Sequence, residues 1–198
     1  MGQYFSNEKL PSKVKKTTCN ILNHSFTFLT DNGVFSKDGV DFGSRLLLES
    51  IPLKEVGAKV LDVGCGYGTL GIVVSKLTGA KVDMVDVNLR AIHLANRNIK
   101  ENDCINALAY ESNCYSEVSE LYNTIITNPP IRAGKKIVYD IVLNAVNYLD
   151  VSGKLFLVIR KEQGAKSLIN EIKDVYDVTV LERSKGFYIL ECVKKIIR

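Results

Sequence analysis

The chain has 198 residues, of which 46% are hydrophobic and 24% charged, and it carries a formal net charge of +4. This length suits one domain with a small appendage, and the composition argues against extended disorder. No apolar run reaches the roughly 20 residues that span a bilayer, and no signal peptide is recognisable, so we expect a cytoplasmic protein. Five scattered cysteines without a CxxC pair indicate neither a disulfide framework nor a zinc site, so we expect no metal.

The first 58 residues differ in pattern from the rest. Residues 1–20 carry four lysines against the single acid Glu8, and Pro11 interrupts any regular element. This segment predicts either a solvated leader or an arm that touches a polyanion. Residues 21–29 alternate loosely, as in an edge strand, and a loop at 34–43 leads into a short helix at about 44–50. We therefore expect a single domain over 21–198, with 21–58 as a lid or appendage and 59–198 as its core.

From Lys59 onward, predicted strands alternate with predicted helices, a pattern typical of a parallel sheet covered on both faces. Strands are predicted at residues 59–63, 81–87, 105–110, 124–127 and 154–159, and helices up to Gly79, from Asn88 to about 100, over 138–149 and over 165–172. The final strands, 175–181 and 186–193, are separated by too few residues for a parallel crossover. The expected fold is therefore α/β, Rossmann-like, with a seven-stranded mostly parallel sheet and an antiparallel last strand.

A glycine-rich loop, with Gly64, Gly66 and Gly68, joins the first predicted strand of this core to its helix. Glycines at such a turn let the backbone bend sharply or come close to a ligand. The G-x-G-x-x-G motif of nucleotide-binding dehydrogenases would need a third glycine at position 69, which is Thr69. A carboxylate at Asp62 would also repel a pyrophosphate, whereas it suits a ligand that carries an ammonium, namely S-adenosylmethionine.

Asp86 ends the second predicted strand of the core, where a carboxylate accepts the two ribose hydroxyls of either cofactor class. Asp86 therefore supports the predicted fold, but it does not distinguish a dehydrogenase from a methyltransferase. The alternative is that Asp62 only caps a turn and that Asp86 is solvated. The position of both acids at the ends of strands favours a ligand site.

The strand at 124–127 ends abruptly at Asn128-Pro129-Pro130. Neither proline can continue the ladder, so the chain leaves the sheet at Asn128, at the strand end where open α/β sheets bind ligands. A carboxamide can hold an amine but is a poor general base. If the Asn128 oxygen and the Pro129 carbonyl each accept one proton of an amine, its lone pair is turned towards a methyl donor. These three residues are the candidate catalytic group.

With these motifs in this order, the sequence resembles the class I S-adenosylmethionine-dependent methyltransferases, whose sheets also end in an antiparallel pair. Two stretches, at 33–47 and 128–135, more narrowly resemble the RsmC-like guanine N2-methyltransferases of small-subunit ribosomal RNA. The resemblance implies that Asp62, Gly64 and Gly66 border the methionine part of the cofactor and that Asp86 binds its ribose. It also implies that Asn113 accepts from the adenine amine, where the family often has an acid.

The same resemblance places Phe35 and Asp41 in an element that closes over the cofactor, with a packed loop as the alternative. The residue after the two prolines is commonly aromatic in amino-methyltransferases, where it stacks on the target base, but here it is Ile131. Arg132 could stack its guanidinium plane instead, and with Lys135 and Lys136 it gives a basic rim. This rim favours a polyanion, with an ordinary solvated loop as the alternative. Ile131, Arg132 and Lys135 are thus the candidate substrate contacts.

The expected function is methylation of the N2 amine of a guanine in 16S ribosomal RNA, by a monomer that acts on the RNA or on the small subunit. N6-adenine and glutamine-amide methylation use the same Asn-Pro-Pro geometry and remain alternatives. A third alternative, from a different class, is a non-catalytic RNA-binding assembly factor that retains the fold.

Overall fold

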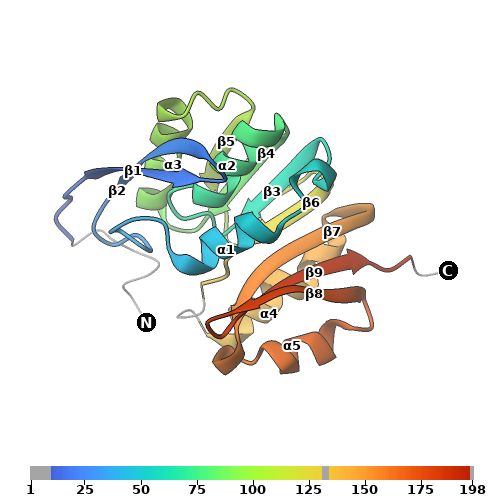
Figure 1. Cartoon of the computed structure of the whole chain (residues 1–198). Helices are drawn as coiled ribbons and strands as arrows, with labels where there is room; N and C mark the ends of the chain where they lie inside the picture. The colour runs from blue at the N-terminus through green and yellow to red at the C-terminus, as the bar shows by residue number, and fades with distance from the viewer. Residues whose placement is uncertain (1–9, 131–133, 197–198) are drawn as a thin grey trace.

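The computed structural model describes residues 10–130 and 134–196, which form two sheets and several helices (Figure 1). The strands are β1 (Lys15–Ile21), β2 (His24–Thr30), β3 (Lys59–Val63), β4 (Lys81–Asp86), β5 (Ala107–Glu111), β6 (Tyr122–Thr127), β7 (Leu149–Arg160), β8 (Tyr176–Ser184) and β9 (Phe187–Lys194). The helices are α1 (Phe42–Ser50), α2 (Thr69–Thr78), α3 (Leu89–Glu101), α4 (Lys135–Asn144) and α5 (Ala165–Ile172), with short 3-10 turns at Leu53–Glu55, Ala145–Asn147 and Lys161–Gln163.

The large sheet has seven strands in the order β5-β4-β3-β6-β7-β9-β8. Strands β5, β4, β3, β6 and β7 are parallel, whereas β9 runs antiparallel to both of its neighbours, β7 and β8. The β8–β9 connection is a two-residue turn in which Lys185 and Gly186 have φ of 48° and 79°. Positive φ at both central residues is typical of tight hairpins, because it matches the twist of the strands. The expected fold class, including the antiparallel last strand, is confirmed.

Helices cover both faces of this sheet (Figure 1). Val60 of β3 belongs to a core shared with α1, α2 and α3, whereas Leu61 and Val63 belong to a second core shared with α4 and α5. This split follows from the alternation of side chains along a strand, which sends neighbouring residues to opposite faces. Both faces of the central strands are therefore buried. In the described ranges, no helix has the length and apolar character needed to cross a membrane.

The N-terminal hairpin begins within the segment that was expected to be a leader. The predicted leader would end at residue 20, but residues 15–20 lie within β1, which pairs with β2 along its whole length. The hairpin packs on α3, whose Asn98 and Asn102 lie one turn apart. Asn98 accepts from the Leu29 backbone N–H at 2.7 Å and donates to its carbonyl at 3.0 Å, and Asn102 bonds Thr27 in the same way. On the edge of β2 that does not face β1, two side-chain amides thus make the hydrogen bonds that a further strand would make.

The helix predicted over 138–149 is also shorter than expected. Helix α4 ends at Asn144, and Leu149 is the first residue of β7, where it pairs with Tyr122 next to a register shift. Its side chain is fully buried, and helical spacing alone could not distinguish a helix position from the start of a buried strand.

Candidate active site

A cavity of about 710 Å³ opens where β3, β4 and β6 end, within the size range of small-molecule sites. It brings together most of the residues predicted from the sequence. The lining includes Phe35, Asp41, Gly64, Gly66, Asp86, Asn113, Asn128, Pro129 and Pro130. Of the other described candidates, Asp62 and Lys135 do not line it.

The glycine loop turns over the end of β4. Gly64, Gly66 and Gly68 all have positive φ, at 72°, 55° and 96°, a conformation that side chains oppose. The Gly64 amide donates to the Val85 carbonyl at 2.8 Å, which holds the loop on the strand. A Cβ built on Gly66 would have no atom within 4 Å, so the backbone there is open to the cavity. A ligand can approach the main chain closely at this point.

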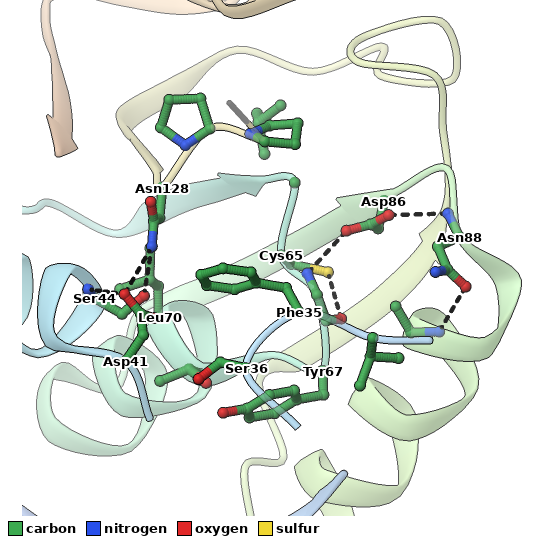
Figure 2. Close-up of a pocket in the computed structure, with 18 of the residues that line it drawn as sticks. Phe35, Ser36, Asp41, Ser44, Cys65, Tyr67, Leu70, Asp86, Asn88 and Asn128 are labelled. Atoms are coloured by element: carbon green, nitrogen blue, oxygen red, sulfur yellow. Dashed lines mark hydrogen bonds between the residues drawn. The ribbon is translucent and has the colours of Figure 1, made fainter. Parts of the chain in front are cut away.

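Asp86 is held at the cavity wall by two backbone donors. Its Oδ1 accepts from the Asn88 amide and its Oδ2 from the Gly66 amide, each at 2.9 Å (Figure 2). Burial raises the pKa of this carboxyl above its usual value, although the two bonds oppose the shift. Each carboxylate oxygen keeps lone pairs that can accept from a hydroxyl of a ligand. The geometry suits the expected ribose contact.

Asp62 lies behind the glycine loop rather than in the cavity wall. Its side chain is 0% exposed, and its Oδ2 accepts from the Gly71 amide at 2.8 Å. Its Oδ1 has no hydrogen-bond partner among the described residues. Burial, reinforced by the charge of Asp86, raises the pKa of Asp62 to about 7. A buried carboxylate oxygen without a donor is costly, so this oxygen suits a hydrogen-bond donor that the protein itself does not provide.

Asn128 is held in one orientation by the start of α1. Its Nδ2 donates to Ser44 Oγ at 2.9 Å and to Asp41 Oδ1 at 3.3 Å (Figure 2). A carboxylate only accepts hydrogen bonds, so the amide nitrogen must face Asp41 and the amide oxygen must face away. The oxygen is thereby left to accept from a ligand. Asp41 lines the cavity, and its carboxylate accepts a hydrogen bond from Asn128.

Asp41 is also the N-cap of α1, accepting from the Ser44 amide at 3.0 Å. Ser44 was not predicted as a site residue. The available signal was the three-residue spacing of Asp41 and Ser44 ahead of an apolar run, which marks the first turn of a helix. That spacing locates the helix cap. It does not indicate that Asn128, more than 80 positions later, donates to the same two side chains.

Phe35 and Asn113 line the side of the cavity next to Asp86. The Phe35 side chain is 48% exposed, and its ring projects into the space between Cys65 and Asn128 (Figure 2). The Asn113 backbone amide donates to Ser116 Oγ at 3.2 Å, which fixes the loop after β5.

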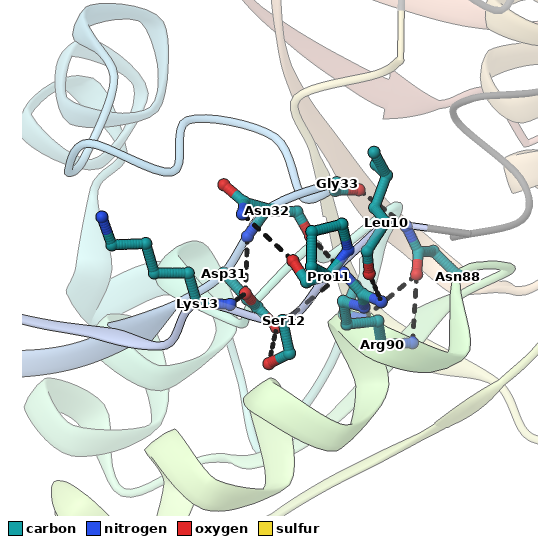
Figure 3. A network of polar contacts seen from close by, with 10 residues as sticks. Leu10, Pro11, Ser12, Lys13, Asp31, Asn32, Gly33, Asn88 and Arg90 are labelled. Atoms are coloured by element: carbon teal, nitrogen blue, oxygen red, sulfur yellow. Dashed lines mark hydrogen bonds and ion pairs between the residues drawn. The ribbon is translucent and has the colours of Figure 1, made fainter. Parts of the chain in front are cut away.

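The segment before Phe35 is tied to the N-terminal arm (Figure 3). Asp31 accepts from Ser12 Oγ at 2.7 Å, and Arg90 donates to the carbonyls of Leu10 and Asn32 at 2.7 and 2.8 Å. Asn88 donates to the Gly33 carbonyl at 3.2 Å. These bonds connect α3, which follows Asp86, to the loop that carries Phe35. The arm therefore supports the wall of the cavity.

The expected basic rim is described only in part. Ile131 and Arg132 lie outside the described residues. Lys135 begins α4, where its ammonium lies 3.7 Å from Glu171 and 4.7 Å from the centroid of the Tyr139 ring. The structure therefore does not bring Lys135 to the cavity.

Further residues line the cavity on the side of β7 and β9, and the sequence did not indicate them. They are Phe42, Arg160, Gln163, Lys185 and Phe187. They lie in no common motif and come together only because β7 pairs with β9 and α1 lies against both strands.

One family model and several known proteins are similar to this chain. A family model described as "Methyltransferase small domain" matches residues 25–191. An uncharacterized protein of Bacillus subtilis, YbxB, is 42% identical over 98% of this chain and 100% of that protein. The ribosomal RNA small subunit methyltransferase C of Psychromonas ingrahamii is 32% identical over 92% of this chain and 52% of that protein.

Among solved structures, the 16S rRNA N2 methyltransferase of T. thermophilus, in complex with AdoMet and guanosine, superimposes with a TM-score of 0.83. It is 28% identical, and the match covers 94% of this chain and 52% of that one. The chain thus spans about half the length of the RNA methyltransferases described above.

The fold, the glycine loop and the Asn-Pro-Pro cavity define the class, an α/β methyltransferase, as expected. Within that class, the chain belongs to the methyltransferase small domain family.

Proposed function

We propose that this chain methylates the exocyclic N2 amine of a guanine in 16S ribosomal RNA. The observation that carries the proposal is the orientation of Asn128, whose amide nitrogen is held by Asp41 and Ser44 so that its oxygen is available to an amine. The names of the relatives from P. ingrahamii and T. thermophilus support guanine N2 and ribosomal RNA as the acceptor. A ribosomal substrate also implies the cytoplasm as the place of action.

Two features of the chain fit S-adenosylmethionine. The open backbone at Gly66 leaves room for the cofactor beside Asp86, which would accept from its ribose hydroxyls. The unpartnered Oδ1 of Asp62 suits a hydrogen bond that leads through water to its ammonium. Asn113 would accept from the adenine amine, and Phe35 would lie against the cofactor. When bound, the cofactor supplies a methyl group on a positively charged sulfur. A nitrogen lone pair attacks the methyl carbon, and the sulfur leaves as a neutral thioether.

The role of Asn128 is to localise the lone pair of the acceptor. An exocyclic base amine is a weak nucleophile because its lone pair is delocalised into the ring. When Asn128 Oδ1 and the Pro129 carbonyl each accept one amine proton, the lone pair is turned out of the ring plane towards the methyl group. A strong base is unnecessary, because the nitrogen becomes acidic once it carries the methyl group and can then lose its proton.

The test is to incubate the protein with tritiated S-adenosylmethionine and, in separate reactions, small ribosomal subunits, free ribosomal RNA and release factor. Nucleoside analysis of the labelled product should find N2-methylguanosine. Label in N6-methyladenosine or in protein would replace the proposal with one of the two alternative acceptors, and no label in any reaction would support a non-catalytic role.

The variant Asn128→Ala tests the mechanism. We expect its kcat to fall by about 100-fold or more, the size seen when one preorganised hydrogen-bonding group is removed from a site, while cofactor affinity is retained. Asn147→Ala is the matched control, because Asn147 is exposed and does not line the cavity. Turnover of the Asn128 variant at the rate of the control would show that the carboxamide has no catalytic role.

A further inference from the structure

The part of the cavity bounded by β7 and β9 contains a stack of aromatic and cationic groups. The Arg160 guanidinium carbon lies 4.6 Å from the centroid of the Phe187 ring, and the Phe42 ring lies 5.4 Å from Phe187 at an interplanar angle of 54°. The Lys185 ammonium lies 4.7 Å from the Phe42 centroid. All four side chains line the cavity that contains Asn128. We name this group, Phe42, Arg160, Lys185 and Phe187, the aromatic wall.

The aromatic wall lies near Asp41, one of the two residues that orient Asn128. A Cβ built on Gly43 would lie 3.0 Å from Phe187 Cε1 and 3.2 Å from Asp41 Oδ1. The same Asp41 oxygen accepts from Asn128. Gly43 therefore allows the Phe187 ring and the Asp41 carboxylate to approach one point at the start of α1. The edge of the wall and the carboxylate that holds Asn128 thus lie on either side of Gly43.

The wall is accessible and is held in place by the sheet. Phe42 is 36% exposed and the Arg160 side chain 47%, so both present surface to a ligand. Arg160 pairs with Phe187 across β7 and β9, and the Lys161 amide donates to the Gly186 carbonyl at 2.8 Å. Glu162 bonds Arg160 Nη1 at 3.0 Å. Because Glu162 binds the edge of the Arg160 guanidinium, the flat face of that group stays available for stacking.

A methyl acceptor on a nucleobase requires a surface for its ring. Four aromatic side chains line the cavity within the described residues, namely Phe35, Phe42, Tyr67 and Phe187. Tyr67 is only 3% exposed, and Phe35 belongs to the loop that Asn88 ties to the Asp86 side. Phe42 and Phe187 are the pair that lie against each other and beside Arg160, so we assign this pair to the acceptor. Guanidinium planes and aromatic rings are the groups on which unpaired bases stack.

Resting on the proposed function, we propose that Phe42, Phe187 and Arg160 form the platform on which the target base stacks while its amine reaches Asn128. Lys185 contacts the phosphate next to that base. In related amino-methyltransferases the stacking surface is an aromatic residue directly after the two prolines. Here the platform on β7, β9 and α1 would supply that surface. The acceptor class is an unpaired nucleotide, since a base within a duplex presents only its edges.

The chain contains a matched control for this platform on the opposite face of the sheet. The Arg183 guanidinium carbon lies 4.9 Å from the centroid of Tyr188, so Arg183 makes the same type of contact as Arg160. Phe187 and Tyr188 are consecutive in β9 and contribute to different cores. Neither Arg183 nor Tyr188 lines the cavity. Arg183→Ala therefore removes an equivalent stacked cation without touching the proposed platform.

The experiment compares Arg160→Ala and Phe187→Leu with Arg183→Ala, after thermal melts establish that each variant is folded. Methyl transfer is measured against RNA concentration, and cofactor affinity by calorimetry. The loss of one stacking surface should lower kcat/KM for RNA by about 5- to 100-fold, mainly through KM. The dissociation constant for S-adenosylmethionine should stay within about 2-fold of the wild-type value, and Arg183→Ala should behave as the wild type.

The same variants are tested for binding of guanosine monophosphate and of a short single-stranded RNA, without turnover. If the wild type methylates RNA but the Arg160 and Phe187 variants match Arg183→Ala, the platform is overturned and the proposed function stands. If the wild type transfers no methyl group to RNA but binds the nucleotide through Arg160 and Phe187, the proposed function falls and the platform stands. The platform is also overturned if the variants keep the kinetics of the wild type and nucleotide binding is either absent or equal in all variants.

Discussion

The two sides of the cavity are built in different ways. The side next to Asp86 comes mainly from consecutive elements, β3, the glycine loop, α2 and β4, to which the loops that carry Phe35 and Asn113 are added. The side next to Phe187 comes from α1, the end of β7 and the β8–β9 turn, which are far apart in the sequence and contribute side chains. Under the proposals above, the side built from a local motif would take the cofactor, and the side built from long-range contacts would take the acceptor.

The largest expected effect concerns Asp62, on the cofactor side. Its pKa is raised from 3.8 to about 7 in the folded chain, so the folded state holds a proton that the unfolded state releases. Stability should therefore fall as the pH rises from about 4 to about 7, by on the order of 4 kcal/mol from this group. Denaturant unfolding across this range should show the fall in the wild type, and Asp62→Asn should reduce it.

S-adenosylmethionine provides the control for this prediction. A donor near the unpartnered oxygen favours the ionised carboxylate, so the bound cofactor should weaken the pH dependence of the wild type and leave that of Asp62→Asn unchanged. Equal pH dependence of both proteins without cofactor would remove Asp62 as the cause.

The second prediction tests the junction between the two sides, at Asp41. Asp41→Ala removes the acceptor of Asn128 and the N-cap of α1, so kcat should fall by about 10-fold and stability by about 1 kcal/mol. Asp41→Ser is the matched variant, because serine caps a helix but has no carboxylate. It should recover most of the stability without recovering kcat. Full recovery of kcat would mean that Asp41 serves only the helix.

The smallest expected effect comes from Gly43, at the edge of the aromatic wall. Alanine would place its Cβ 3.0 Å from Phe187 Cε1 and 3.2 Å from Asp41 Oδ1, which is closer than ordinary contact. Both groups must then shift by a few tenths of an ångström. Alanine is also a better helix former than glycine by about 1 kcal/mol. We expect kcat/KM to fall several-fold with no loss of thermal stability. An unchanged rate would show that Gly43 does not set the spacing.

Most of the sheet could be predicted because its strands are short apolar runs separated by turn residues. Asp86 and Asn128 were identified because a strand followed directly by a polar residue places that residue at the ligand-binding edge. The predictions that failed depended on partners. Strand β1 is mostly exposed and polar, and its pairing with β2 could not be inferred from residues 1–20 alone. Leu149 fits a helical spacing, but its burial beside Tyr122 assigns it to β7.

By itself, the sequence determined the class of enzyme, because the glycine loop, Asp86 and Asn128-Pro129-Pro130 are local motifs whose chemistry follows from residue type and position on a strand. The tertiary structure alone decided how Asn128 is oriented and what faces it. Asp41 reaches Asn128, and Arg160 reaches Phe187, only after α1 and β9 have packed beside β6 and β7. Contacts of this kind depend on burial and strand pairing over the whole chain, which no local pattern records.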